Sequence, residues 1–391
     1  MNKFIVIDNK NLKLGYYFED NKLSDIRCYE EGSILGNIYV GRVSNILNNI
    51  NAVFVDIMSG LSCYMSLEDY KGEKKLKTGD ILPVQISKDS IKTKQPSVTT
   101  DISLTGEYVI IHSDSTVGVS AKIKDNQVRD NLKALFKEVL FDFEAEKKCK
   151  DITYGAVIRT KAADSENVST QDIKKEMLEL LKKLDDMLSK AAFMSAYSVV
   201  YKNEAAYLKD MCIFSKHPEC EVITDSPEIY NEFTNTYNTE IMHYNDEMIS
   251  LTNLYNLKSL TEKALSKRAY LKSGAYLVIE HTEAMTVIDV NSGKAIKGRN
   301  SEENIYKINC EAAMEIARQL KIRNISGIII VDFISMKNES LNQNLLNELK
   351  DFTKNDFIPV NVIDITRLGL VELTRKKVRK PLYEMAHLIK Y

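Results

Sequence analysis

The sequence has no hydrophobic run near the roughly 18 residues that a membrane-spanning helix needs. Its first residues, MNKFIVID, read as a strand and lack the apolar core of a signal peptide. We therefore expect no membrane span and a cytoplasmic location.

Cysteine and histidine are few and scattered. The six cysteines form no CxxC pair, none lies near a histidine at zinc-finger spacing, and the five histidines do not cluster. This distribution argues against a disulfide framework, a structural zinc site and a histidine-based catalytic site. His281 lies near the acidic residues described below, but a lone histidine is more commonly structural.

The sequence also lacks a strong charge of one sign, since its net charge is −2. Many nucleic-acid-binding domains are strongly basic, so any contact with nucleic acid must come from a local patch. The clearest patch is the RKKVRK run at residues 375–380, in which Arg375 and Lys376 are candidate RNA contacts. Such a run is usually only the solvated face of a helix.

The chain is long enough for several domains, and 44% hydrophobic and 28% charged residues are ordinary for a globular protein. Its sequence pattern changes along the length. The pattern predicts a short β meander at residues 1–33, an all-β region at 34–105, an α/β region at 106–206, a mixed region at 207–273, and strands with helices at 274–391.

The all-β region contains five short strand patterns, which suggest a small closed barrel of the OB type. Barrels of this kind bind single strands by stacking bases on exposed aromatic rings beside basic side chains. Tyr39, Tyr64 and Tyr70 are candidate platforms, with Lys92 and Lys94 nearby. Packing inside the barrel is an equally good explanation for any one of these tyrosines.

A group of polar side chains follows the strand pattern at residues 156–158. Arg159, Thr160 and Lys161 offer guanidinium, hydroxyl and ammonium donors, which suit a phosphate group. This segment alone does not decide whether a phosphate is bound.

Two apolar strands in the C-terminal region end in carboxylates. Residues 286–288 lead into Asp289, and residues 328–331 lead into Asp332. An ionised carboxylate at the end of a buried strand needs a partner or a cation, and two from neighbouring strands suit Mg²⁺ or Mn²⁺. Asn291 lies two residues beyond Asp289 and therefore on the same face of the strand. The alternative, in which each aspartate caps a loop or pairs with a nearby arginine, stays open on this pattern.

The segment between these strands has a helical pattern. Ser301 is a candidate N-cap, with Glu302 and Glu303 in the first turn. A strand, helix, strand order would place both carboxylates at the same end of a sheet. The apolar residues at helical spacing are Ile305, Ile308, Ala312, Ile316 and Leu320, and the basic residues at the far end are Arg318, Lys321 and Arg323.

Six motifs occur in order along the chain: GNIYVGRV, ISLTGEYVII, GAVIRT, EHTEAMTVIDVNSG, EAAMEIARQLKIRNISGIIIVDFI and ITRLGLVELTRKKVR. Together they resemble the ribonuclease E/G family across essentially the full chain, most specifically in the C-terminal half. No long basic tail follows, so the resemblance is to the compact ribonuclease G type.

The resemblance implies an α+β multidomain fold. In this layout an RNase H-like subdomain, residues 1–33 and 207–273, is interrupted by an S1-type OB barrel at 34–105 and a 5′-sensor region at 106–206. A DNase I-like catalytic subdomain follows at 274–391.

The resemblance also implies roles near the acidic residues. Asp289 and Asp332 match carboxylates that hold a catalytic Mg²⁺, with Mn²⁺ as an alternative, and Asn291 matches the asparagine beside them. Arg367 matches an arginine near this site and would offset developing negative charge. The aspartate often found three residues after the second carboxylate is Ser335 here, which removes an outer acid and leaves the ligands intact.

The same resemblance implies contacts with RNA. Arg159 and Thr160 match the pair that grips a 5′-monophosphate. Tyr64 stands where the family has a base-stacking phenylalanine, and Lys94 falls at a basic position on the RNA path. The change from phenylalanine to tyrosine keeps a stacking face.

The family typically continues into a CPxC segment whose zinc joins two protomers. This sequence contains no such pair. We therefore expect no zinc, and a homodimer of this chain would lack the zinc link.

These features imply a Mg²⁺-dependent endoribonuclease that hydrolyses single-stranded RNA, leaves 5′-phosphate and 3′-hydroxyl ends, and is stimulated by a 5′-monophosphate. Its expected substrates are messenger RNA or ribosomal RNA precursors, in RNA processing or decay. The alternative is a non-catalytic RNA-binding protein that retains the fold, although the intact Asp289, Asn291 and Asp332 argue against it. A sugar-phosphate or nucleotide hydrolase is disfavoured because such an enzyme would not need the barrel.

Overall fold

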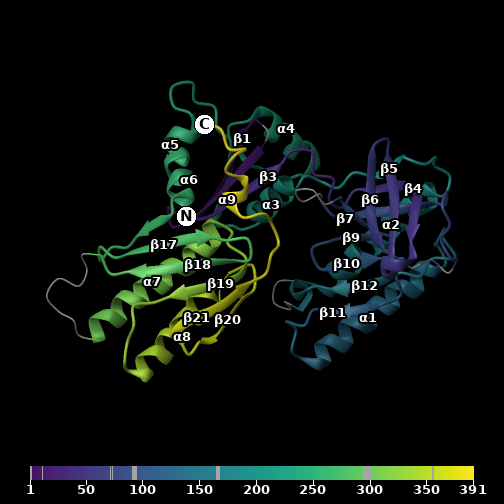
Figure 1. Ribbon diagram of the computed structural model, residues 1–391. Coiled ribbons are helices and arrows are strands. Elements are labelled where there is room, and N and C mark those ends of the chain that lie inside the picture. The colour runs from purple at the N-terminus through teal and green to yellow at the C-terminus, as the bar shows by residue number, and fades with distance from the viewer. Residues whose placement is uncertain are drawn as a thin grey trace. The chain divides into compact units, whose positions relative to one another are not determined.

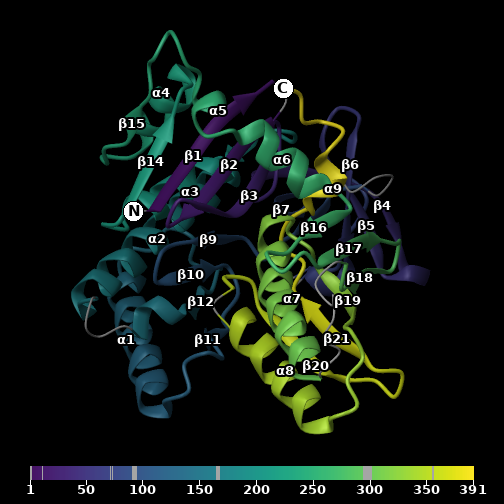
Figure 2. The ribbon, with the colours of Figure 1, turned by 90° about the vertical axis from the view of Figure 1, so that its left-hand side faces the viewer.

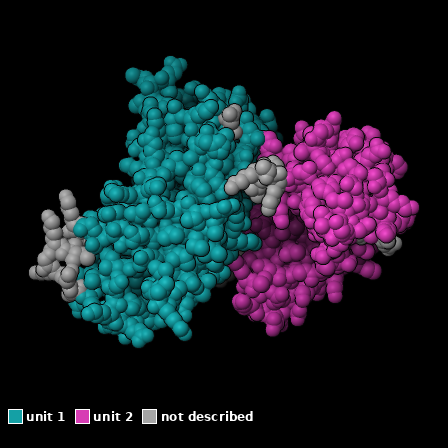
Figure 3. All heavy atoms as spheres, viewed as in Figure 1, with its two compact units in different colours: residues 1–31, 205–391 teal, residues 32–204 magenta. Residues whose placement is uncertain are grey.

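The chain forms two compact units in the computed structural model (Figure 1). Unit 1 consists of residues 1–31 and 205–391, and unit 2 of residues 32–204 (Figure 3). Among the described residues, no helix is long and apolar enough to cross a membrane. The described residues are 2–10, 12–70, 72, 74–89, 95–163, 168–293, 302–354 and 356–391.

The first sheet of unit 1 is built on the predicted N-terminal meander. Alternate residues of β1 pack on opposite faces, with Phe4 and Val6 against α3 and α4, and Ile5 and Ile7 against α5 and α6. The order of the sheet is β15-β14-β1-β2-β3. Its strands are β1 (Asn2–Asn9), β2 (Leu12–Glu19), β3 (Lys22–Glu30), β14 (Cys220–Thr224) and β15 (Met242–His243), and its helices are α3 (Ala206–Ser215), α4 (Pro227–Thr236), α5 (Leu251–Leu254) and α6 (Leu257–Leu265).

The second sheet of unit 1 has six strands in the order β16-β17-β18-β19-β21-β20. Helices α7 (Glu302–Ile322) and α8 (Glu339–Thr353) pack side by side on one face of it (Figure 2). The strands are β16 (Arg268–Tyr270), β17 (Tyr276–His281), β18 (Met285–Asn291), β19 (Gly327–Asp332), β20 (Val360–Ile365) and β21 (Leu370–Arg375). A short helix, α9 (Leu382–Met385), packs in the core of the first sheet.

Helix α7 shows the predicted helical pattern. Ile308, Ala312, Ile316 and Leu320 are buried and share a core with β18 and β19. Its described part begins at Glu302. The carboxylates of Glu302 and Glu303 in the first turn interact favourably with the positive end of the helix dipole. The predicted N-cap, Ser301, lies outside the described residues.

Unit 2 begins with the predicted closed barrel of five strands. These are β4 (Ile38–Leu47), β5 (Ala52–Met58), β6 (Leu61–Ser66), β7 (Ile81–Lys88) and β8 (Ser97–Thr99). Pairing of β4 with β7 closes the barrel, and β13 (Val199–Tyr201) extends it alongside β4. The inward residues Val53, Val55 and Met65 have no exposed surface, as the alternation in a small barrel requires.

The remainder of unit 2 is a four-stranded sheet with two long helices. The sheet has the order β11-β12-β10-β9. Asp125 is the N-cap of helix α1, and its side chain accepts hydrogen bonds from the backbone N–H groups of Gln127 and Val128. The elements are β9 (Ser103–Thr105), β10 (Val109–His112), β11 (Val117–Val119), β12 (Gly155–Ile158), α1 (Asn126–Glu144) and α2 (Thr170–Ala191).

Candidate active site

Asp289 and Asp332 lie on adjacent parallel strands, directly opposite one another in the register of β18 and β19. Neighbouring strands are about 4.8 Å apart, so the two carboxylates are within reach of one cation. Both are exposed, whereas Ile288 and Val331 beside them are buried under the helices. The carboxylates therefore project from the face of the sheet that is opposite to α7 and α8.

Asn291 lies on the same strand and its side-chain Nδ2 donates to Oδ2 of Asp289 at 2.6 Å. This bond fixes one carboxylate oxygen and adds no charge. Within the described ranges, neither Asp289 nor Asp332 forms an ion pair, and Asp332 forms no side-chain hydrogen bond. The described residues thus offer no arginine partner of the kind that the alternative interpretation requires.

Arg367 lies in the turn between β20 and β21. Thr366 and Gly369 close this turn through backbone bonds of 2.8 Å from Thr366 N to Leu370 O and 2.9 Å from Gly369 N to Thr366 O. Leu370 is directly opposite Asp332, so the turn lies at the same end of the strands as the two carboxylates. Arg367 is exposed there. All four residues predicted for the catalytic site thus lie at one end of the strands of a single sheet.

Asn309 is a supporting residue that the sequence pattern did not reveal. It lies on α7 with no exposed surface. Its side chain holds the loop that follows Asp332, donating to the carbonyl of Ile334 at 2.8 Å and accepting from its N–H at 3.1 Å. Ser335 lies in this loop. The available signal was one polar residue inside an apolar helical stripe.

Arg159 and Thr160 lie in unit 2 at the end of β12, and both are exposed. Arg159 Nη1 donates to the carbonyls of Gly106 and Glu107, the latter at 3.2 Å. The Thr160 hydroxyl lies 3.1 Å from the hydroxyl of Ser120, which the sequence pattern did not single out. In the described part of the chain Arg159 has no carboxylate partner, which leaves guanidinium donors for an anion.

Glu176 of α2 organises the backbone beside Arg159. Its carboxylate accepts from the N–H groups of Glu107, Tyr108 and Val109 at 2.5, 2.7 and 3.2 Å. These bonds hold the carbonyls that orient the arginine. No sequence pattern indicates this role, because Glu176 lies about 70 residues away along the chain.

The barrel tyrosines separate into different classes. Tyr64 on β6 is 37% exposed and its ring makes an edge contact with Phe54, with centroids 6.4 Å apart. Tyr39 is buried, so it packs the barrel and is not a platform. Tyr70 donates its hydroxyl to the carbonyl of Lys74 at 2.8 Å. Tyr64 remains the candidate for stacking, whereas the predicted basic residues Lys92 and Lys94 lie outside the described residues.

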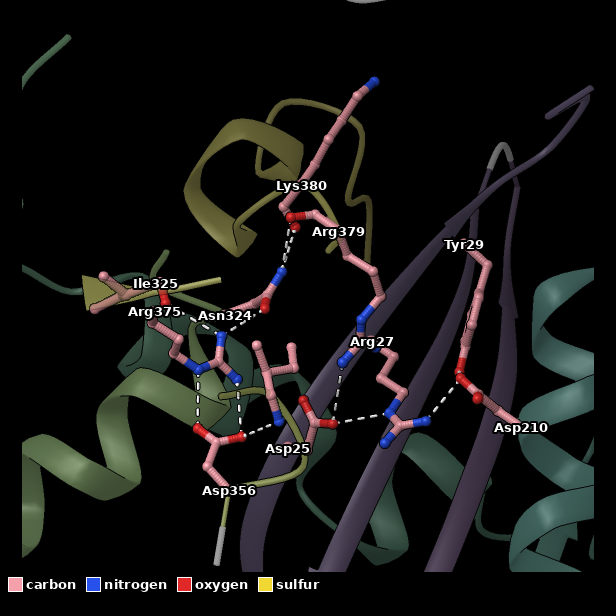
Figure 4. Close-up of polar contacts among 11 residues, drawn as sticks. Asp25, Arg27, Tyr29, Asp210, Asn324, Ile325, Asp356, Arg375, Arg379 and Lys380 are labelled. Atoms are coloured by element: carbon pink, nitrogen blue, oxygen red, sulfur yellow. Dashed lines mark hydrogen bonds and ion pairs between the residues drawn. The ribbon is translucent and has the colours of Figure 1, made fainter. Parts of the chain in front are cut away.

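Arg375 does not fit the prediction of an RNA contact. It is 3% exposed, and its guanidinium forms two bonds to Asp356, of 2.8 Å from Nε and 3.2 Å from Nη2 (Figure 4). Its Nη1 donates to Asn324 Oδ1 and to the carbonyl of Ile325. Side chains alternate between the two faces of β21, and that of Arg375 points inward. It therefore does not belong to an RNA-binding surface.

The rest of the basic run is not the helix face that such runs usually form. Residues 376–380 follow β21 without a helix. Arg379 pairs with Asp25 at 3.5 Å, and Lys380 with Glu30 at 2.6 Å, so both hold the segment to β3. Lys376 is exposed, and its role as an RNA contact stays a prediction.

Comparison with known proteins shows similarity over both units. Residues 103–378 match the model of the Ribonuclease E/G family. Ribonuclease G of Salmonella typhimurium (strain SL1344) is 31% identical over 392 residues, which cover 93% of this chain and 77% of the relative. Ribonuclease G of Haemophilus influenzae is 32% identical, covering 89% and 74%. Ribonuclease E of Synechocystis sp. is 30% identical, covering 98% of this chain and 58% of the relative.

Proposed function

The chain belongs to the ribonuclease E/G family and is an endoribonuclease, and on that premise we propose that it hydrolyses single-stranded RNA with the help of Mg²⁺. The products would carry 5′-phosphate and 3′-hydroxyl ends. The observation that carries this proposal is the register that sets Asp289 opposite Asp332, with Asn291 bonded to the first of them. The family resemblance drawn from the motifs is confirmed.

The donor set at this edge suits a hard divalent cation. Two exposed carboxylates provide oxygen ligands, which Mg²⁺ and Mn²⁺ prefer over nitrogen and sulfur. Asp289 and Asp332 would hold the ion. When bound, it would supply Lewis-acid stabilisation of the phosphate and lower the pKa of a water molecule.

The chain's own residues have separate tasks in this proposal. Asn291 orients the carboxylate of Asp289 through its hydrogen bond. Among the described residues its amide oxygen has no donor, so this oxygen can accept from water or face a ligand. Arg367, exposed at the hairpin turn, would stabilise negative charge that develops on the phosphate. Asn309 keeps the loop after Asp332 in place. These tasks need positioned side chains on a rigid sheet, which the structure provides.

Unit 2 would supply binding to RNA. The exposed ring of Tyr64 offers a face for stacking a base, which is tolerant of sequence. Arg159 and Thr160 would bind a 5′-monophosphate and so stimulate cleavage. We propose the family layout for the chain: an RNase H-like subdomain at 1–33 and 207–273, an S1-type OB barrel at 34–105, a 5′-sensor region at 106–206, and a DNase I-like subdomain at 274–391.

A direct test is cleavage of a fluorogenic single-stranded oligonucleotide that carries a 5′-phosphate. We expect cleavage with Mg²⁺ or Mn²⁺ and none after chelation, because the carboxylate pair needs its cation. RNA binding, measured by fluorescence anisotropy in the same buffers, should survive chelation. Undiminished cleavage in the chelator would contradict the proposal, and binding without cleavage in Mg²⁺ would favour the non-catalytic alternative.

The 5′-monophosphate site can be tested with Arg159→Ala. Removing a charge-assisted contact costs about 1.5–3 kcal/mol, so kcat/KM for 5′-monophosphorylated RNA should fall roughly 10- to 100-fold. The value for 5′-hydroxyl RNA should not change, since that substrate has no terminal phosphate.

A matched control is Lys190→Ala, which also removes an exposed positive charge from unit 2. Lys190 lies 14 residues along α2 from Glu176, about 21 Å at the rise of a helix. This variant should keep the preference for 5′-monophosphate. An unchanged preference in Arg159→Ala would remove this site from the proposal.

A further inference from the structure

Unit 1 contains a cavity of about 420 Å³ at the end of the second sheet that is opposite to the carboxylate pair. It is lined by the ends of α6, α7, β17 and α9. His281, in its wall, pairs with Thr286 near the start of β18, whereas Asp289 lies near the other end of that strand. The size lies within the usual range for small-molecule sites, roughly 300–1,000 Å³. Nothing in the proposed RNA cleavage uses this space.

Arg323 borders the cavity and is an unusually buried cation. It follows the last residue of α7 and is 3% exposed. Its Nη1 donates to the carbonyl of Ser266 at 2.6 Å, and its Nε donates to the side chain of Gln319. Its Nη2 is buried without a hydrogen-bond partner among the described residues.

The charge of Arg323 is also poorly compensated. It forms no ion pair within the part of the chain that the structure describes. Burial lowers the pKa of its guanidinium to about 10, and the more distant Glu315 offsets this only in part. Desolvating a cation without a counter-charge is costly, so a missing anion is the simplest physical reason for this arrangement.

The other walls suit a ligand that has both an anionic and an apolar part. His281 stacks on Tyr383 with ring centroids 3.9 Å apart and planes at 14°. Burial lowers the pKa of His281, which favours the neutral ring, whose face can stack on a ligand. Lys267 lies at the rim, with a side chain 78% exposed, and pairs with Glu280 at 3.2 Å. A second cation thus lies at the entrance, paired with a carboxylate that also lines the cavity.

We propose that this cavity binds a small phosphate monoester, with Arg323 as the buried cation and Lys267 as the cation at the rim. A phosphate group in the cavity would compensate the charge of Arg323, which borders it, and arginine is well suited to this group. The stacked rings of His281 and Tyr383 would contact the carbon frame of the ligand. A purely structural role for Arg323, in which Nη1 caps α6 through the Ser266 carbonyl, leaves the uncompensated charge and the cavity unexplained.

The test is isothermal titration of the full chain with inorganic phosphate, AMP, adenosine and a 5′-phosphorylated oligonucleotide. It is carried out with chelator and in the Arg159→Ala background, so that neither the carboxylate pair nor the 5′-monophosphate site contributes. We expect saturable binding of phosphate and of AMP, and none of adenosine. Binding of the oligonucleotide alone would show that the phosphate belongs to RNA and would overturn the assignment to a small ligand.

Substitutions in the cavity then locate the site. Arg323→Gln should weaken AMP binding about 10- to 100-fold, as for loss of a charge-assisted bond. Because Arg323 is buried, its replacement can unfold the protein, so Lys267→Gln and Tyr383→Leu provide independent variants. Each of these should weaken binding up to about fivefold, as expected for a partly exposed contact.

Lys258→Gln on α6 is the control, since it removes an exposed lysine that does not line the cavity. It should bind AMP as tightly as the Arg159→Ala parent. The proposal fails if the folded parent shows no saturable binding of phosphate or AMP. It also fails if Lys267→Gln and Tyr383→Leu both bind AMP as the parent does, or if adenosine binds as tightly as AMP.

Discussion

Asp289→Asn and Asp332→Asn are each expected to lower kcat by roughly 10³-fold or more and to leave the Kd for RNA within about twofold of its original value. The substitution keeps the shape of the side chain and removes one negative charge. Since Asp289 and Asp332 are the only residues proposed to hold the cation, neither can be replaced by the other. The measurements are single-turnover cleavage of a defined oligonucleotide and anisotropy for binding.

Glu283→Gln is the matched control for these two variants. Glu283 is exposed in the turn before β18, beyond Met285, which is itself about 13 Å from Asp289 along the strand. The same change from acid to amide there should leave cleavage unaffected. Full activity of Asp289→Asn or Asp332→Asn would refute the site, and an equal loss of RNA binding would show that these residues act before the chemical step.

Arg375→Leu is expected to lower the free energy of unfolding by about 3–5 kcal/mol. The side chains of Arg375 and Asp356 are 2% and 3% exposed, so the substitution leaves a buried carboxylate without its partner. It also removes the donor to Asn324 Oδ1 and to the Ile325 carbonyl. Urea denaturation followed by circular dichroism measures the change.

Two further variants separate the buried ion pair from other effects. Lys377→Leu removes an exposed charge from the same basic run and should change stability by no more than about 0.5 kcal/mol. The double variant Arg375→Leu with Asp356→Leu should recover much of the loss, because replacing both buried partners by apolar groups is far less costly than leaving one charge unpaired. A stability loss of Arg375→Leu no larger than that of Lys377→Leu would contradict the structural role assigned to Arg375.

Much of the local structure could be predicted from patterns of short range. Short strand-like segments separated by polar turns predict the strands of the N-terminal meander, and five short strand patterns predict the barrel. The helical spacing from Ile308 to Leu320 likewise predicts the buried stripe of α7. The sequence also identifies the two carboxylates, because each directly follows a short apolar strand pattern.

Other features depended on contacts between distant residues. Arg375 belongs to a basic run that looks solvated in the sequence, yet pairing of β21 with β19 turns it toward Asp356. Tyr39 and Tyr64 are both barrel tyrosines, and only the packed barrel shows that one is buried and the other exposed. Glu176 and Asn309 stabilise loops far from them in sequence, which no local pattern reveals.

The sequence by itself determined which residues can do chemistry, the order of strands and helices around them, and the family. Only the tertiary structure decided that Asp289 lies directly opposite Asp332, because strand register is set by the packing of α7 and α8 on a sheet whose strands are tens of residues apart. It likewise decided that Arg375 is structural and that Arg323 faces a cavity. Burial, and hence the cost of leaving a charge unpaired, is a property of the assembled fold.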